Sequence, residues 1–265
     1  MIRAETETHW LLVTHPDHAH LAGQVADAWG NAEFARPEPF APIRYATYHH
    51  DDGWLARDAK PSLTPAGIPE AFTRDLVGAY SAFEEIDLPS YLAVRGAATA
   101  AVAAQDPTAG IIVSMHTVNL LTEQADESTI QPEHRAAHAA FVAAQRAWQT
   151  TEGERLGLNL SALQRGFEFL QACDNLSLIA CSGFAQPRPL RHRHPDRTGQ
   201  LREIQCQPQN PTTWKLDPWP LAADTLELTV SVRRLPKDSF TDEASYRSAF
   251  TAAPIKTHEI LLTRK

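Results

Sequence analysis

Residues 159–181 read NLSALQRGFEFLQACDNLSLIAC and follow the spacing of one buried helix face. Apolar residues recur every three or four positions, as in an amphipathic helix that packs against a core. Asp174 stands in the middle of this stripe. A buried carboxylate without a partner is costly, so the helix predicts that other segments bring polar partners to Asp174.

The segments before this stretch are predicted to be helical as well. Thr14, with Pro16 and Asp17 after it, is typical of a helix start. That helix should end near Gly30, and a second helix is expected over 43–54. Alanine-rich segments separated by prolines then predict four further helices, near residues 69–86, 89–105, 107–123 and 132–151.

Strands are predicted only near the two ends of the chain. Residues 9–14, 226–233 and 258–263 are rich in β-forming residues, and 226–233 alternates cleanly. The tail should pair with the N-terminal strand, because neither end can form a stable sheet alone. We therefore predict one domain over 1–265, mostly α with a small β-sheet from N- and C-terminal segments: a helical bundle core at 14–182 and β-rich accessory parts at 1–13 and 200–265.

Composition excludes several classes of protein. The chain has 24 Lys+Arg and 32 Asp+Glu, a net charge of 24 − 32 = −8, which disfavours extended nucleic-acid binding. No apolar run approaches the roughly 20 residues of a membrane span. Three cysteines without a CxxC pair fit a reducing compartment. We expect a cytoplasmic protein that binds neither nucleic acid nor membrane.

Histidine is abundant, with 12 residues, and several histidines lie on apolar helix faces beside acids. A single histidine or aspartate in such a place is usually a core residue that bonds to the backbone. Several that converge would satisfy each other best by sharing a cation. We predict a site for one or two divalent ions of iron, manganese or zinc, with ligands His18, His50, Asp51, His116 and Asp174.

The order His, His-Asp, Asp on successive helices resembles the HD-domain superfamily of metal-dependent phosphohydrolases. A closer similarity, over the whole chain, is to an uncharacterised bacterial family known only as a domain of unknown function. That similarity rests on residues 16–23 (PDHAHLAG), 50–54 (HDDGW), 114–116 (SMH) and 173–178 (CDNLSL). The HD resemblance covers about 14–180 and implies an HD-like helical bundle. It assigns the primary ligand positions to His18, His50, Asp51 and Asp174, and an additional or second-metal position to His116.

The predicted function is hydrolysis of a small phosphorylated or anionic compound through a metal-bound water. Asp52 or Asp17 would serve as general base, and Lys60 would neutralise an anionic substrate group. Two alternatives stay open: a di-iron oxygenase of the HD-like type, and a non-catalytic binding module whose polar cluster is closed by internal hydrogen bonds. The partner is expected to be a small molecule, and the oligomeric state, a homo-oligomer included, is open.

Overall fold

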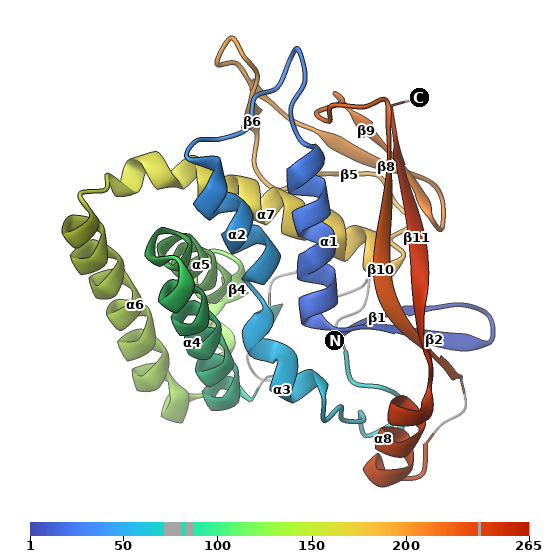
Figure 1. Cartoon of the computed structure of the whole chain (residues 1–265). Helices are drawn as coiled ribbons and strands as arrows, with labels where there is room; N and C mark the ends of the chain where they lie inside the picture. Colours follow the sequence, from blue (N-terminus) through green and yellow to red (C-terminus); the bar gives the residue numbers. More distant parts are fainter. Residues whose placement is uncertain (72–80, 83–86, 238–239, 265) are drawn as a thin grey trace.

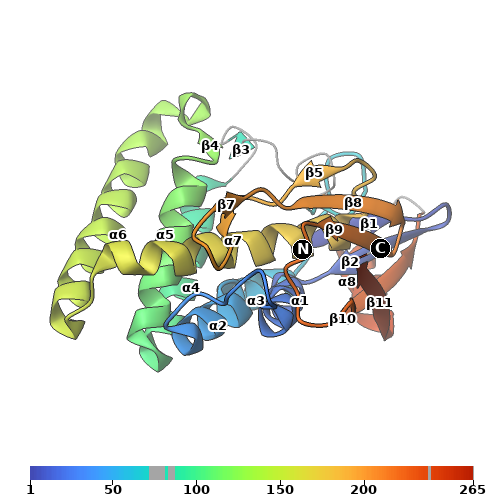
Figure 2. The ribbon, with the colours of Figure 1, turned by 90° about the horizontal axis from the view of Figure 1, so that it is seen from above.

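A computed structural model describes residues 1–71, 81–82, 87–237 and 240–264. A group of helices lies beside a curled sheet, and the long helix α7 runs from the helical side toward the sheet (Figure 1). Seen from above, α7 lies between strands β5 and β8 on one side and helices α1 and α2 on the other (Figure 2). The predicted stripe at 159–181 therefore forms the central element of the fold.

Local signals in the sequence explain the helix boundaries. The Thr14 hydroxyl accepts a hydrogen bond from the backbone N–H of Asp17 at the start of α1, as predicted. Asp106 caps α5 in the same way, and Gly157 and Gly183 end α6 and α7 in the left-handed conformation. The helices are α1 (His15–Ala28), α2 (Phe40–His49), α3 (Leu55–Asp58), α4 (Leu88–Gln105), α5 (Pro107–Leu121), α6 (Arg135–Leu156), α7 (Leu160–Ser182) and α8 (Glu243–Ala252).

The predicted helix at 69–86 falls largely on positions 72–80 and 83–86, which lie outside the described residues. The two residues described between these ranges form the short strand β3 (Ser81–Ala82), which pairs with β4 (Ala125–Asp126). Among the helices of the described ranges, none combines the length and the apolar character that crossing a membrane requires.

The main sheet has seven strands in the order β1-β2-β10-β11-β9-β8-β5. Neighbouring strands are antiparallel except β11 and β9, which are parallel. Arg233 pairs with Leu12, so the predicted pairing of the tail with the N-terminal hairpin is confirmed. The strands are β1 (Ile2–Glu5), β2 (His9–Val13), β5 (Arg188–Pro189), β8 (Gln205–Asn210), β9 (Thr213–Asp217), β10 (Thr225–Pro236) and β11 (Ile255–Thr263).

The expectation of a mostly α, HD-like helical bundle with a small sheet is wrong. The sheet is large because residues 188–217 contribute three strands that the sequence pattern does not predict individually, although the part from residue 200 onward is expected to be β-rich. Strand β8 reads QCQPQN, in which only Cys206 is buried, and Pro208 is unfavourable inside a sheet. Antiparallel pairing with β5 and β9, together with the burial of Cys206 in the core, holds this segment in the sheet rather than intrinsic strand preference.

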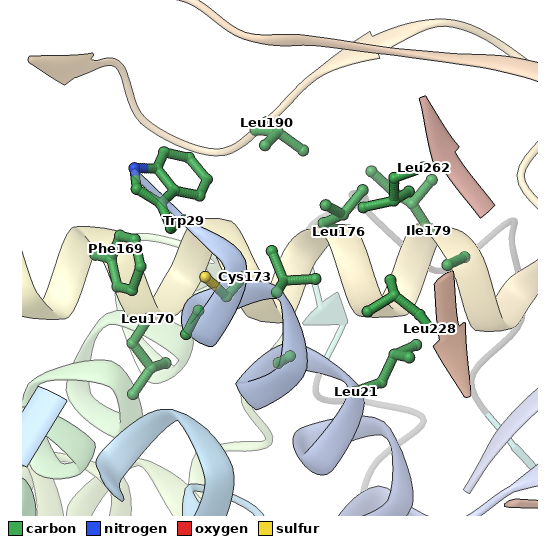
Figure 3. Close-up of a cluster of buried hydrophobic side chains, with 14 of the residues drawn as sticks. Leu21, Trp29, Phe169, Leu170, Cys173, Leu176, Ile179, Leu190, Leu228 and Leu262 are labelled. Atoms are coloured by element: carbon green, nitrogen blue, oxygen red, sulfur yellow. The ribbon is translucent and has the colours of Figure 1, made fainter. Parts of the chain in front are cut away.

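Helices and sheet share one hydrophobic core. Leu176 and Ile179 of α7 face Leu228 of β10 and Leu262 of β11, while Leu21 approaches from α1 (Figure 3). At the other end of the same stripe, Trp29 meets Phe169 edge to face with ring centroids 5.1 Å apart. The core therefore fixes the position of α7, and with it the position of Asp174, relative to α1.

Candidate metal centre

Four segments bring the predicted ligands together. His18 lies in the first turns of α1, His116 on α5 and Asp174 on α7. His50 and Asp51 do not continue a helix to residue 54 as expected, because α2 ends at His49 and a 3-10 turn (η1, Asp52–Trp54) follows. We call the five residues His18, His50, Asp51, His116 and Asp174 the inner cluster.

Close packing against α4 explains the turn after α2. A side-chain carbon at Gly53 would lie 2.7 Å from the backbone nitrogen of Ala98, nearer than real contacts allow. Glycine therefore lets η1 approach the α4 backbone. The turn lets His50 and Asp51 face the same cluster, although a regular helix would separate adjacent side chains by about 100°.

The distances within the inner cluster are short. Nε2 of His50 lies 3.4 Å from Oδ1 of Asp174, and Nδ1 of His18 lies 3.7 Å from the same oxygen. One potential ligand atom from each of these three residues lies within 4.8 Å of the other two. The His50 ring also meets the rings of His18 and His116 edge to face, with centroids 5.5 Å and 5.3 Å apart. The predicted convergence on Asp174 is present in the fold.

His50 is oriented as a ligand would be. Its Nδ1 lies 2.9 Å from the backbone oxygen of Thr47, so Nδ1 carries the proton and donates it. Nε2 is buried and makes no well-aligned hydrogen bond within the described part of the chain, so it is the atom at which a metal ion could replace a proton. Metal-binding histidines are held in this way, with one nitrogen bonded to the protein and the other bare.

Asp51 connects the cluster to helix α4. Its Oδ1 accepts a hydrogen bond from Nη1 of Arg95 at 2.6 Å, and its Oδ2 lies 2.9 Å from Nε2 of His18. The other nitrogen of His18 lies 2.9 Å from the Ser177 hydroxyl. Both oxygens of Asp51 therefore have protein partners, and the carboxylate orients His18 as well as facing His50 at 3.9 Å.

His116 stands at the edge of the cluster and belongs to a chain of polar contacts. Oε1 of Gln171 accepts a hydrogen bond from Nε2 of His192, so the Gln171 amide nitrogen points the other way. That nitrogen lies 3.5 Å from Nδ1 of His116, which therefore accepts. The proton of His116 is then on Nε2, 3.9 Å from Oδ2 of Asp174. In this arrangement His116 presents a donor rather than a lone pair to Asp174.

The electrostatics of the cluster follow from burial and mutual pairing. Burial opposes the charge on His50, but Asp51 and Asp174 more than offset it and raise the pKa of His50 to about 9. Burial also opposes the charge on Asp174, yet His50 and His116 lower the pKa of Asp174 to about 2. Burial lowers the pKa of His116 to about 3, so His116 is neutral. The two carboxylates therefore stay ionised and favour a positive charge at His50.

The donor set fits a first-row divalent ion. Ligand atoms that share one ion at about 2.1 Å lie roughly 3 to 3.5 Å apart, close to the His50–Asp174 separation. Imidazole nitrogens with a carboxylate oxygen suit iron, manganese or zinc better than calcium or magnesium. The Asp174 side chain is 11% exposed, whereas those of His18 and His50 are 2% or less. Asp174 therefore forms the solvent-facing edge of the cluster.

The three predicted catalytic residues lie elsewhere. The Asp52 carboxylate pairs with His49 at 2.7 Å, outside the inner cluster. The Asp17 carboxylate accepts a hydrogen bond from the Thr14 hydroxyl and completes the cap of α1. Lys60 is exposed in the segment after α3. Their proposed roles came from proximity in the sequence, and the fold does not bring these side chains into the inner cluster.

Sequence reasoning missed Arg95, Gln171 and Ser177. Arg95 is 6% exposed on α4 and Gln171 is 1% exposed on α7. A signal for Arg95 exists, because it is an arginine within the alanine-rich run YLAVRGAATAAV. A buried arginine needs a carboxylate partner. Gln171 and Ser177 share helix α7 with Asp174 at three-residue spacing, and polar residues so placed can face the same neighbours.

A family model described as a protein of unknown function (DUF3891) matches residues 1–237. The chain belongs to this family. The predicted similarity to a domain-of-unknown-function family is therefore confirmed, while the HD resemblance stays a prediction. No curated protein and no solved structure matches the chain.

Proposed function

We propose that this DUF3891 protein is a metal-dependent hydrolase that acts on a small phosphorylated or otherwise anionic compound. Nδ1 of His18, Nε2 of His50 and Asp174 would hold the divalent ion, with Asp51 orienting His18 through Nε2. The ion would take the place of the Ser177 hydroxyl at Nδ1 of His18. The observation that carries the proposal is the bare, buried Nε2 of His50, fixed through Thr47 and aimed at Asp174 across 3.4 Å.

A bound divalent ion supplies a nucleophile near neutral pH, because it lowers the pKa of water. His116 contacts the cluster through both ring nitrogens, since its Nε2 faces Asp174 and its Nδ1 is held by Gln171. Its neutral state at pH 7 follows from burial. We therefore assign His116 as a neutral hydrogen-bond donor that orients Asp174, and we assign no catalytic role to Asp52 or Asp17, whose side chains lie outside the inner cluster.

A basic pocket next to the cluster supports an anionic substrate. This pocket, of about 390 Å³, is lined by residues 188–193 together with Asn175 and Glu203. Three of its residues are arginines against a single glutamate, although the whole chain carries a net charge of −8. Positive charge concentrated in this way favours phosphate or carboxylate groups.

Covalent continuity and hydrogen bonds connect the basic pocket to the inner cluster. Asn175 directly follows Asp174 in α7, and its side-chain oxygen accepts a hydrogen bond from the backbone of Arg191. His192, which bonds to Gln171, has a backbone φ of 66°. A left-handed backbone conformation costs a residue other than glycine of order 1–3 kcal/mol, and such residues are often found at functional sites. We therefore expect the substrate's anionic group to bind between this pocket and Asp174.

The test combines metal analysis with a substrate panel. Protein purified without chelator should contain close to one divalent ion per chain, and should hydrolyse at least one of a set of phosphoesters when manganese, iron or zinc is supplied. His50→Ala should lose both the ion and the turnover. The control His9→Ala, which replaces a partly exposed histidine on β2, should retain both. Protein that contains no ion, or that binds one identically after His50→Ala, would refute the proposal.

Two other outcomes distinguish the alternatives. Two irons per chain with an oxo-to-iron absorption band would contradict the hydrolase and favour an oxygenase. A bound ion without turnover on any anionic ester would favour a binding module instead.

A further inference from the structure

A second group of metal-ligating side chains lies outside the inner cluster. His20, His49 and Asp52 each offer one ligand atom, and these three atoms lie within 4.8 Å of one another. We call this group the outer cluster. His20 is exposed, and the side chains of His49 and Asp52 are 30% and 41% exposed. An ion from solution could therefore reach the outer cluster without any rearrangement of the core.

We propose that the outer cluster is a separate binding site for a transition-metal ion of the zinc type. Two imidazoles and one carboxylate form a borderline-soft donor set that suits zinc, cobalt, nickel or copper, and they leave positions open for water. Calcium and magnesium prefer oxygen ligands and should bind poorly. This site does not depend on the function proposed for the inner cluster.

The geometry already places the ligands in position. Nδ1 of His49 lies 2.7 Å from Oδ2 of Asp52, and the His20 and His49 rings meet edge to face with centroids 6.0 Å apart. Each imidazole also packs against a tyrosine of α2. The ring centroids of His49 and Tyr45 lie 4.3 Å apart, and those of His20 and Tyr48 lie 5.7 Å apart. These contacts limit the rotation of both rings, so less side-chain entropy is lost when an ion binds.

The location of the outer cluster gives it a consequence for the fold. His20 is two residues beyond His18 on α1, while His49 and Asp52 flank the turn that carries His50 and Asp51. An ion bound here would tie α1 to that turn on the solvent side. We expect such a clamp to raise the resistance of this junction to unfolding, as any ligand specific to the native state does.

The test is a zinc chloride titration, measured by isothermal calorimetry, of the wild-type protein and of the double variant His20→Ala/His49→Ala. Both replaced side chains are at least partly exposed, so the variant should fold. The wild type should show a binding phase that the double variant lacks. His9→Ala, which removes a partly exposed histidine on β2, should retain this phase. Magnesium should produce no such phase. Copper bound in this phase should show hyperfine coupling to two nitrogens by electron paramagnetic resonance.

Identical zinc stoichiometry and affinity in the wild type and the double variant would overturn the proposal. Failure of the inner site is a different result: the wild type would then show only the outer phase, and the double variant would show none. A third variant, Asp52→Asn, should weaken the outer phase and leave the circular dichroism spectrum unchanged. An Asp52→Asn protein that binds zinc as tightly as the wild type would contradict the assignment of the carboxylate ligand.

Discussion

The guanidinium of Arg95 donates a hydrogen bond to Oδ1 of Asp51 at 2.6 Å, in a part of the protein where both side chains are almost fully buried. This contact joins α4 to the turn after α2. It also leaves the second oxygen of Asp51 facing His18 and His50. The position of the inner cluster therefore depends on a residue that touches none of the three proposed ligand atoms of the ion.

Replacement of Arg95 by methionine should destabilise the protein strongly. The Asp51 carboxylate would remain buried without its cationic partner, and breaking a buried pair in this way costs about 3–5 kcal/mol. Urea denaturation followed by circular dichroism measures the change. Arg155→Met is the matched control, because Arg155 pairs with Glu152 on the surface and its loss should leave the unfolding midpoint unchanged. Equal effects of the two variants would contradict this account of Arg95.

In the His20→Ala/His49→Ala background, which lacks the outer cluster, Asp174→Asn should abolish metal retention. The amide keeps the shape of the carboxylate but removes the negative charge that faces His50 and forms the solvent-facing edge of the cluster. Metal content per chain after gel filtration gives the result directly. Asp224→Asn, at a side chain that is 81% exposed, should keep the wild-type content. A metal-loaded Asp174→Asn protein would show that the ion binds elsewhere.

Gly53→Ala should weaken both the fold and the inner cluster. The added carbon would press against the α4 backbone at Ala98, and such overpacking costs roughly 1–3 kcal/mol. Because η1 carries the turn with His50 and Asp51, we also expect reduced metal affinity. Gly96→Ala on α4 is the control: its new carbon would make an ordinary 3.4 Å contact with Phe141, and alanine favours helices. Gly96→Ala should therefore be as stable as the wild type or more stable.

His194 should contribute to acid sensitivity. Burial beside Trp29 lowers the pKa of His194 to about 4, below the usual 6.5. Between about pH 4 and 6.5, His194 therefore binds a proton in the unfolded chain but not in the folded chain. The resulting stability is fully present above pH 6.5 and is lost as the pH falls from 6.5 toward 4, by about 1.4 kcal/mol per pH unit. In His194→Gln the free energy of unfolding should fall less steeply with decreasing pH, by the contribution of one proton, whereas His9→Gln should show the wild-type pH dependence. A wild-type slope in His194→Gln would contradict the assignment.

The basic pocket should determine substrate affinity more than turnover. Arg193→Ala removes positive charge from the pocket but lies outside the inner cluster. On any ester that the protein hydrolyses, KM should rise about tenfold or more with a small change in kcat, because charged hydrogen bonds contribute about 1.5–3 kcal/mol. Inorganic phosphate should also inhibit the variant less. Arg146→Ala, on the solvent side of α6, should leave KM unchanged, and a fall in kcat alone for Arg193→Ala would contradict the role in binding.

Much of the local structure could be predicted from the order of residues. The cap at Thr14, the long helix around Asp174 and the alternating strand at 226–233 all appear where the pattern places them. The convergence of His18, His50 and Asp174 could also be predicted, because polar residues on apolar helix faces must find partners. These features depend on short-range periodicity or on the cost of burying an isolated charge.

Other features depend on contacts between segments far apart in the chain. Strand β9 joins the sheet through parallel pairing with β11, and strand β8, which contains Pro208, joins it through β9 and β5. The end of α2 at His49, the pairing of Arg95 with Asp51 and the grouping of His20 with Asp52 have the same origin. Hydrophobic patterning determined which faces are buried. Only tertiary packing decided which polar atoms meet, because that depends on ångström-scale positions of backbones that local sequence does not specify.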